Sequence, residues 1–351
     1  MAINEQKLHE FMGKAVGDIG AAMSVGLTLI GEKLGLYRAL AEHGPQSSKD
    51  LAKRTHTAER YVREWGYNQA AGGYINYDPK THHFSIDEEQ ALALAHENSP
   101  VYLHGAFDII CSIIRDQAKL EKAFKTGEGI PWGDHDGCLF CGTERFFRPN
   151  YNANLLTSWL PALEGVEQKL RNGAVVADVG CGHGSSTIIM AKAFPKSKFI
   201  GFDFHTRSID AAREAAKRAG CGNNIEFVAA SSTDFTGSDY DLVTCFDCLH
   251  DMGDPIGASA HILSTLKKDG TWMIVEPFAG DSPEENLNPI GRVFYGASAS
   301  ICVPASIAFD GPALGAQAGE KVLTEVIKEG GFTKVRRVAE TPFNIVLEAR
   351  G

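Results

Sequence analysis

The segment VVADVGCGHG, residues 175–184, constrains the fold of this chain more than any other part of the sequence. A run of strand-forming residues leads into Asp178, and glycines then occupy the alternate positions 180, 182 and 184. Glycines at such a strand-to-helix turn let the backbone approach a nucleotide-like ligand closely. Ser185 stands where the dinucleotide fingerprint G-x-G-x-x-G requires its third glycine, which argues against NAD as the ligand.

Strand and helix patterns alternate along the chain after this turn. The next strand, Lys198–Phe202, runs into Asp203, whose carboxylate can accept both hydrogen bonds of a ribose diol. Further helices are expected at Thr187–Phe194, Ser208–Ala219, Ala258–Leu266 and Lys321–Glu329, and further strands at Ile225–Ala229, Tyr240–Cys245, Gly270–Val275, Lys334–Val338 and Asn344–Ala349. This order predicts a doubly wound, Rossmann-like α/β sheet.

The first part of the chain has the pattern of a winged helix. Helices are expected at Ser47–Arg54 and Ala58–Ala71, and two short strands at Tyr74–Tyr77 and His82–Ile86. A winged helix can bind DNA, but residues 47–85 hold six Lys or Arg against four Asp or Glu, which is not the basic face of a DNA-binding domain. We therefore expect residues 1–97 to be a dimerisation domain.

The remaining chain divides into a connecting segment and the α/β domain. The apolar positions of Ala21–Leu40 follow one helix face, which we expect to pack against a second subunit in a homodimer. Residues 98–150, with a helical stretch Pro100–Lys125, are expected to form a linker or cap. Residues 151–351 form the α/β domain, which starts with a helix Asn152–Leu160 and includes a Gly-, Ala-, Ser- and Pro-rich lid insertion, residues 279–317.

Composition limits the choice of partner and compartment. A formal net charge of −10 over 351 residues disfavours nucleic acid as the main ligand. No apolar run reaches the length of about 18 residues that a membrane span requires, so a membrane is not expected. Eight cysteines without a signal peptide favour reduced thiols and a cytoplasmic location.

The glycine turn and Asp203 together resemble the cofactor motifs of class I S-adenosylmethionine-dependent methyltransferases. The likeness covers nearly the whole chain, because LHDMGDP, EPFAGD, NLNPIGR and TPFNIVLEAR are similar to segments of a bacterial winged-helix group of that family. The resemblance implies S-adenosylmethionine as cofactor, S-adenosylhomocysteine as product and a small-molecule methyl acceptor. It also implies a homodimer, a terminal antiparallel hairpin in the sheet and a pocket closed by the insertion.

The cofactor residues are expected at the carboxyl ends of the strands. The glycine-turn amides at the helix N-terminus are expected to face the carboxylate of the amino-acid moiety, and Asp203 is expected to bind the ribose. Phe204, Ser231 and Ser232 are expected to contact the adenine. The residues after the fourth strand are expected to flank the methionyl portion. The candidate set is Asp178, Gly180, Cys181, Gly182, Gly184, Asp203, Phe204, Ser231, Ser232, Phe246 and Asp247.

His250, in CFDCLHDMGDP, is the strongest candidate for chemistry, because a histidine can remove the proton of a hydroxyl acceptor near neutral pH. In related O-methyltransferases the histidine of this segment is the general base, with Asp251 or Asp254 here as the orienting acid. Oxygen is the expected acceptor atom, with nitrogen, sulfur or carbon as alternatives. Trp132, His135, Phe147, Tyr151 and Glu276 are candidates for the acceptor pocket or lid, although Glu276 could instead be an exposed strand end.

Two other interpretations remain open from sequence. Cys138–Cys141 and Cys245–Cys248 are CxxC pairs, but the second pair lies at a strand edge, so small buried cysteines are favoured over a zinc site and no metal is expected. The rival function is a transcriptional regulator that senses S-adenosylmethionine and binds DNA through the winged helix.

Overall fold

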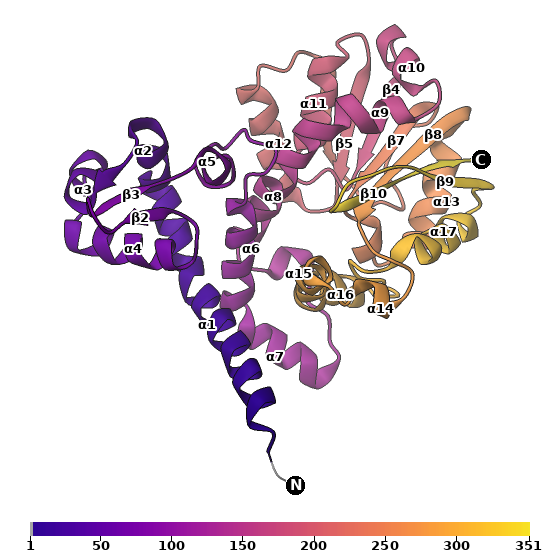
Figure 1. Ribbon diagram of the computed structural model, residues 1–351. Helices are drawn as coiled ribbons and strands as arrows, with labels where there is room; N and C mark the ends of the chain where they lie inside the picture. Colours follow the sequence, from indigo (N-terminus) through magenta and orange to yellow (C-terminus); the bar gives the residue numbers. More distant parts are fainter. Residues whose placement is uncertain (1–2) are drawn as a thin grey trace. The chain divides into compact units, whose positions relative to one another are not determined.

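The computed structural model describes residues 3–351 (Figure 1), and its residues cluster into two compact units. The first unit contains the chain up to Ser112 together with Cys141–Pro149, and the second contains Ile113–Phe140 and Asn150–Gly351. The residues of helix α8 (Cys138–Asn154) are divided between them.

The first unit is a winged helix behind a long helix. Its elements are α1 (Glu5–Lys33), α2 (Leu36–His43), β1 (Gln46–Ser47), α3 (Ser48–Thr55), α4 (Glu59–Ala71), β2 (Asn76–Asp78), β3 (His83–Ser85), α5 (Glu88–Leu94) and α6 (His104–Arg115). The strands form an antiparallel sheet in the order β1-β3-β2, so the expected helix, helix and hairpin are all present. Asn4 and Ser47 cap α1 and α3 with their side-chain oxygens.

Small residues let the helices of this unit approach its aromatic core closely. A side chain at Gly31 would lie 2.7 Å from the Trp65 ring, and one at Gly66 would lie 2.5 Å from the Phe84 ring. The indole of Trp65 also donates to the Leu27 carbonyl at 3.0 Å. These contacts fix α1 against α4 at the C-terminal end of α1.

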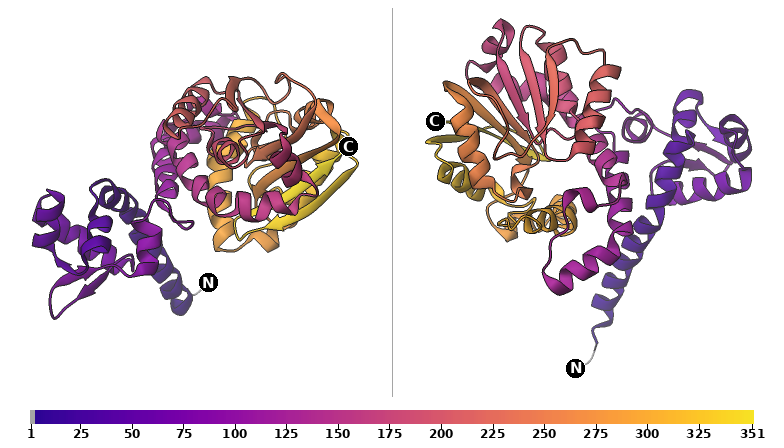
Figure 2. Two further views of the ribbon diagram at one scale, coloured as in Figure 1. Left: turned by 90° about the horizontal axis from the view of Figure 1, so that it is seen from above. Right: turned by 180° about the vertical axis from the view of Figure 1, so that it is seen from behind.

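The second unit is built on a seven-stranded sheet in the order β6-β5-β4-β7-β8-β10-β9 (Figures 1 and 2). The strands are β4 (Val175–Val179), β5 (Lys198–Asp203), β6 (Ile225–Ala229), β7 (Tyr240–Phe246), β8 (Leu266–Pro277), β9 (Lys334–Glu340) and β10 (Asn344–Arg350). Strands β4–β8 pair in parallel, and β10 is antiparallel to both β8 and β9. The predicted doubly wound sheet with a terminal antiparallel hairpin is confirmed.

Helices of this unit precede the first strand of the sheet or lie between its later strands. They are α7 (Gln117–Thr126), α9 (Leu160–Ala162), α10 (Val166–Asn172), α11 (Ser185–Ala193), α12 (Thr206–Arg218), α13 (Pro255–Thr265), α14 (Pro283–Asn286), α15 (Pro289–Ala297), α16 (Val303–Ile307) and α17 (Gly319–Glu329). The chain order reverses direction at β4, so right-handed crossovers place α11 and α12 on one face and α13 and α17 on the other. In doubly wound sheets, the region beyond the carboxyl ends of the strands at such a reversal, here β4 and β7, is where the ligand crevice forms.

Strand register brings distant segments to this crevice. Phe246 at the end of β7 pairs with Val275 of β8, and Asn344 at the start of β10 pairs with Pro277. The residues that follow β7 therefore lie beside the end of β8 and the first residue of β10. Segments almost a hundred residues apart meet at one sheet edge.

Two helices differ from the sequence expectation. Residues 143–151 were expected to lead into a helix starting at Asn152, but α8 begins at Cys138 and passes Pro149. It continues through a π turn, Leu155–Trp159, into α9. Proline is a common cause of kinks in helices, and π turns often accompany functional sites.

The lid insertion is largely helical. Helix α15 passes through a second π turn, Ser298–Cys302, into α16. This helical stretch, Pro289–Ile307, and the helix Glu5–Lys33 are long and apolar enough to cross a membrane by length and composition. Core helices of globular proteins meet the same criterion, so these two helices are weak evidence for a membrane span and do not contradict the absence of a continuous apolar run.

Candidate functional site

Three glycines shape the turn after β4, each with a backbone φ in the left-handed region. A side chain at Gly180 would lie 2.7 Å from the Cys248 sulfur, and one at Gly184 would lie 2.5 Å from the Phe227 ring. A side chain at Gly182 would meet nothing within 4 Å. Gly180 and Gly184 are therefore required for packing, whereas Gly182 faces open space at the crevice.

Asp178, near the end of β4, anchors this turn through hydrogen bonds. Its fully buried carboxylate accepts hydrogen bonds from the hydroxyls of Ser186 (2.7 Å), Thr187 (2.5 Å) and Thr244 (2.9 Å). Burial raises the pKa of Asp178 to about 6, although the three hydroxyls oppose the shift. With three donors already bound, this carboxylate fixes the glycine turn to α11 and β7 and contributes to a ligand site through the turn.

Asp203 ends β5 beside the same turn. One carboxylate oxygen accepts the Gly182 N–H at 2.9 Å, and the other accepts the His205 N–H at 2.8 Å. Each oxygen has a second lone pair, so the carboxylate can still accept two hydrogen bonds from a ligand. Burial raises the pKa of Asp203. The glycine turn and this acid are thus physically coupled through Gly182.

The residues expected around an adenine lie along the next loops. Phe204 is half exposed and packs edge-on against Phe309 of the lid insertion, with ring centroids 5.7 Å apart. The hydroxyl of Ser231 lies 2.9 Å from that of Thr233, and Ser232 follows it in the turn after β6. Cys181 is buried, with its thiol near the Gly182 carbonyl.

Asp247 forms the centre of a polar network after β7. Its carboxylate accepts hydrogen bonds from the Tyr151 hydroxyl at 2.9 Å and the Asn344 side-chain amide at 2.7 Å. Asn150 in turn donates to the Asn344 oxygen at 2.6 Å, and Phe246 packs on the Tyr151 ring. Burial and the nearby Glu276 raise the pKa of Asp247 to about 8.

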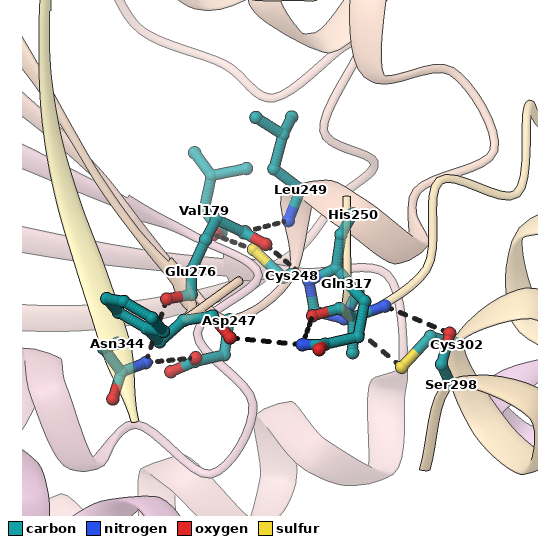
Figure 3. A network of polar contacts seen from close by, with 12 residues as sticks. Val179, Asp247, Cys248, Leu249, His250, Glu276, Ser298, Cys302, Gln317 and Asn344 are labelled. Carbon is teal, nitrogen blue, oxygen red and sulfur yellow. Dashed lines mark hydrogen bonds and ion pairs between the residues drawn. The ribbon is translucent and has the colours of Figure 1, made fainter. Parts of the chain in front are cut away.

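His250 and Glu276 form a buried pair beside this network (Figure 3). Nδ1 of His250 lies 2.5 Å from one oxygen of Glu276, and the other oxygen accepts the Leu249 N–H at 2.8 Å. Nε2 of His250 lies 3.3 Å from the Cys302 sulfur. Burial opposes the charged imidazolium, but Glu276 and Cys302 outweigh it and raise the pKa of His250 well above its ordinary value.

The acid that orients His250 differs from the one expected. Glu276, not Asp251 or Asp254, makes the contact, because the parallel pairing of β7 with β8 places the end of β8 beside residue 250. Glu276 is also 1% exposed, so its interpretation as an exposed strand end is wrong. Asp254 instead caps α13 through the Gly257 N–H. Burial, with help from Glu276 and Asp203, raises the pKa of Asp251 to about 7.

The candidate residues of the connecting segment lie in different places. His135 is buried, with Nδ1 3.1 Å from the Asp116 carboxylate, and Trp132 packs near its ring. Tyr151 reaches Asp247 as described above. Phe147 belongs to the first unit, where its ring packs edge-on against Phe146.

Within residues 3–351, no group of three or more His, Cys, Asp or Glu side chains could hold a metal ion. None of the eight cysteines forms a disulfide in the described residues, 3–351. Cys245 is fully buried in the sheet and Cys248 donates towards the Val179 carbonyl at 3.4 Å. The second CxxC pair is therefore part of the packing around the glycine turn.

Comparison with protein families assigns both parts of the chain. Residues 170–298, which hold the glycine turn, Asp203 and the His250–Glu276 pair, match the family described as a methyltransferase domain. Residues 21–96 match the family described as an Rv2258c-like winged HTH domain. The chain carries a methyltransferase domain behind a winged helix. Both parts of the family resemblance found in the sequence are confirmed.

Relatives and solved structures agree with this assignment. The methyltransferase domain is similar to a ubiquinone biosynthesis O-methyltransferase of Actinobacillus pleuropneumoniae, with 30% identity over 162 residues, 44% of this chain and 62% of the relative. A trans-aconitate 2-methyltransferase of Streptomyces coelicolor is 31% identical over 113 residues, 32% of this chain and 37% of the relative. The chain thus spans less than two thirds of the curated relatives it matches.

Solved structures match over nearly the whole chain. Human N-acetylserotonin methyltransferase, solved with S-adenosylmethionine, has a TM-score of 0.72 at 15% identity, covering 100% of this chain and 99% of that one. An O-methyltransferase family protein from Burkholderia thailandensis has a TM-score of 0.69 at 15% identity, with the same coverage. At this identity the likeness concerns the fold.

Two residues of the site were missed in the sequence. Asn344, which donates to Asp247, begins the last strand, and only the register of the terminal hairpin shows that it reaches the crevice. Cys302 lies in the lid insertion, 52 residues after its partner His250. The signal that could have found Asn344 was a polar residue directly before the apolar run Ile345–Leu347. For Cys302 the sequence holds no such signal.

Proposed function

We propose that this protein transfers a methyl group from S-adenosylmethionine to a hydroxyl oxygen of a small molecule, with His250 as general base. The observation that carries the proposal is the buried Glu276–His250 pair, located at the same sheet edge as the glycine turn and Asp203. A binding motif and a proton acceptor in one crevice are what hydroxyl methylation requires.

The crevice fits the cofactor in two respects. The turn at Gly182 has room for a ligand where a side chain would otherwise stand, and Asp203 retains two accepting lone pairs beside it. Asp203 would hold the ribose, the Gly182 turn the amino-acid carboxylate, and Asp247 the ammonium. Asp178 would act through the turn it braces. When bound, S-adenosylmethionine supplies a methyl group already activated on its sulfonium.

The chain itself would contribute orientation and proton transfer. Nδ1 of His250 donates a hydrogen bond to Glu276, so that above its raised pKa the neutral imidazole carries its lone pair on Nε2 and can take the proton of an acceptor hydroxyl. Cys302 stands at Nε2 in this structure, so the acceptor oxygen would replace the thiol there. Proton removal by a positioned base contributes about 10²–10⁴-fold to the rate, and in-line positioning contributes the rest.

The cofactor part of this proposal is tested by calorimetric titration with S-adenosylhomocysteine. Asp203→Ala should abolish micromolar binding. Asp210→Ala, at an exposed carboxylate on the neighbouring helix α12, should leave binding unchanged. If the wild type does not bind, or if Asp203→Ala binds as well as Asp210→Ala does, the cofactor assignment is wrong. Acceptors can then be found by measuring S-adenosylhomocysteine release with a panel of small hydroxyl compounds.

We further propose that the protein is a homodimer in the cytoplasm. Helix α1 exposes an apolar stripe at helical spacing, made of Leu8, Met12, Val16, Ile19, Met23 and Ile30. An exposed apolar stripe of this length is typical of an interface, and a second copy of the same helix would cover it symmetrically. Eight cysteines that form no disulfide among the described residues fit a reducing compartment.

The regulator alternative has less support. On helix α4, which would enter the DNA groove, Arg60 pairs with Glu64 and Arg63 pairs with Glu59. Both arginines are therefore already neutralised, and phosphate contacts would have to break these pairs. A gel-shift assay with genomic fragments at two salt concentrations would detect any salt-dependent, sequence-selective binding.

A further inference from the structure

Cys302 stands in a chemically unusual place for a thiol. It lies in the π turn of the lid insertion, is 7% exposed, and its sulfur is 3.3 Å from Nε2 of His250 (Figure 3). His250 is itself 4% exposed and Glu276 is 1% exposed. The proposed methyl transfer gives Cys302 no chemical role, so the three aligned side chains remain to be explained.

The order carboxylate, imidazole, thiol is the arrangement that activates a cysteine nucleophile. Glu276 fixes the Nδ1 proton of His250, and Nε2 can then take the proton of the Cys302 thiol. The thiolate so formed is paired with the imidazolium, which Glu276 stabilises from its other side. A buried ion pair of this kind is the usual way in which a protein makes a thiol reactive near neutral pH.

Two other cysteines of the site lack this arrangement. Cys248 donates towards the Val179 carbonyl, and Cys181 towards the Gly182 carbonyl. A carbonyl acceptor stabilises the protonated thiol and disfavours the thiolate. At this edge of the sheet, Cys181 and Cys248 thus lie beside carbonyl groups, whereas Cys302 lies beside an imidazole.

We propose that Cys302 is a nucleophilic thiol that forms covalent adducts with α,β-unsaturated carbonyl compounds, such as enones and quinones, that reach its sulfur. The thiolate sulfur bonds to the β-carbon, and the electron pair of the C=C bond moves to the carbonyl oxygen. The resulting enolate is protonated by the His250 imidazolium. The net change is addition of S–H across C=C; nothing leaves and no oxidant is needed.

This chemistry suits the residues present because His250 both removes and returns the proton. An acyl electrophile would need donors for an oxyanion and an exit for a leaving group, whereas conjugate addition needs only the nucleophile and one proton donor. The pocket that accepts a hydroxyl compound for methylation would thus be alkylated by its unsaturated ketone counterpart.

The proposal is tested by limited labelling of the native protein with N-ethylmaleimide, followed by digestion and mass spectrometry of each cysteine peptide. Cys141, which is exposed, is the internal reference. Cys302 should label about tenfold faster than Cys141 at neutral pH, because the thiolate is the attacking species and His250 takes the Cys302 proton. Equal or slower labelling of Cys302, including no labelling before denaturation, overturns the proposal.

Variants separate activation from simple access to the pocket. Glu276→Gln should slow the labelling of Cys302 about tenfold and leave Cys141 unchanged. Glu348→Gln, at another buried carboxylate of the same sheet, should change neither rate. An unchanged Cys302 rate in Glu276→Gln would refute the role of the carboxylate and histidine. No cofactor or acceptor enters this assay, so its outcome is independent of whether the protein methylates anything.

Discussion

Replacing Glu276 by glutamine changes one oxygen to an NH₂ group and reverses the proton arrangement around His250. The carboxylate now accepts two hydrogen bonds, from Nδ1 of His250 and from the Leu249 N–H. Glutamine has one acceptor oxygen, and the fixed backbone N–H of Leu249 will take it. The NH₂ group must then face Nδ1, which forces the imidazole proton onto Nε2.

A proton on Nε2 removes the lone pair that acts as base, so kcat should fall about 10²–10⁴-fold, equivalent to about 3–5 kcal/mol in activation free energy. Loss of the negative charge also lowers the raised pKa of His250. In the wild type, kcat should rise with pH through that raised pKa, as the imidazolium loses its proton. In the variant the inflection should move to lower pH or disappear.

The assay is S-adenosylhomocysteine release with an acceptor found by screening, measured across pH, together with calorimetric binding of S-adenosylhomocysteine. Binding should not fall, because Glu276 contacts the histidine loop and not the glycine turn, and loss of its negative charge favours the ionised form of Asp247. Glu348→Gln serves as the control and should keep wild-type kcat. The reasoning is refuted if Glu276→Gln keeps wild-type kcat with an unshifted pH profile, or if binding falls as far as kcat does.

Three further results are expected. Gly184→Ala should lower the free energy of unfolding, measured in urea, by about 2–4 kcal/mol, and Gly182→Ala should lower it by about 1–2 kcal/mol. Both glycines have a positive φ, but only a side chain at Gly184 would meet an aromatic ring. Equal losses in the two variants would contradict this reasoning. The affinity for S-adenosylhomocysteine should rise between about pH 6 and 8.5, because Asp247 ionises in that range. Asp247→Asn should abolish the rise. A wild-type affinity that does not change with pH would count against a contact between Asp247 and the cofactor ammonium. In sedimentation velocity, Met23→Asp should give monomers while Ala21→Asp, on the opposite helix face, stays dimeric; two identical profiles would exclude the stripe as the interface.

Much of the fold was predictable because local patterns and topology rules act together in parallel sheets. The alternating glycines after β4 could not fit a regular strand or helix, and each subsequent apolar run had the length of a buried strand. The start of α8 was not predictable, because the residues from Cys138 to Pro149 contain turn formers and a proline that tertiary packing overrides.

The site was predictable only where its residues follow a strand in sequence. Asp203 and His250 were found in this way. The partner of His250 was not, since nearby acids in the sequence, Asp251 and Asp254, were favoured over Glu276, which becomes adjacent only through strand pairing. Contacts that are set by the register between separate strands leave no pattern in the local sequence. The position of Cys302 beside His250 depends in addition on the path of the whole insertion.

The hydrogen bond from Asn344 to Asp247 makes the polar network after β7 depend on the last strand of the sheet. Strands β4–β8 precede Asn344 in the chain and can pair with one another without it. The carboxylate of Asp247 gains its amide donor only when β10 pairs with β8, so the network is completed by the last strand to be synthesised.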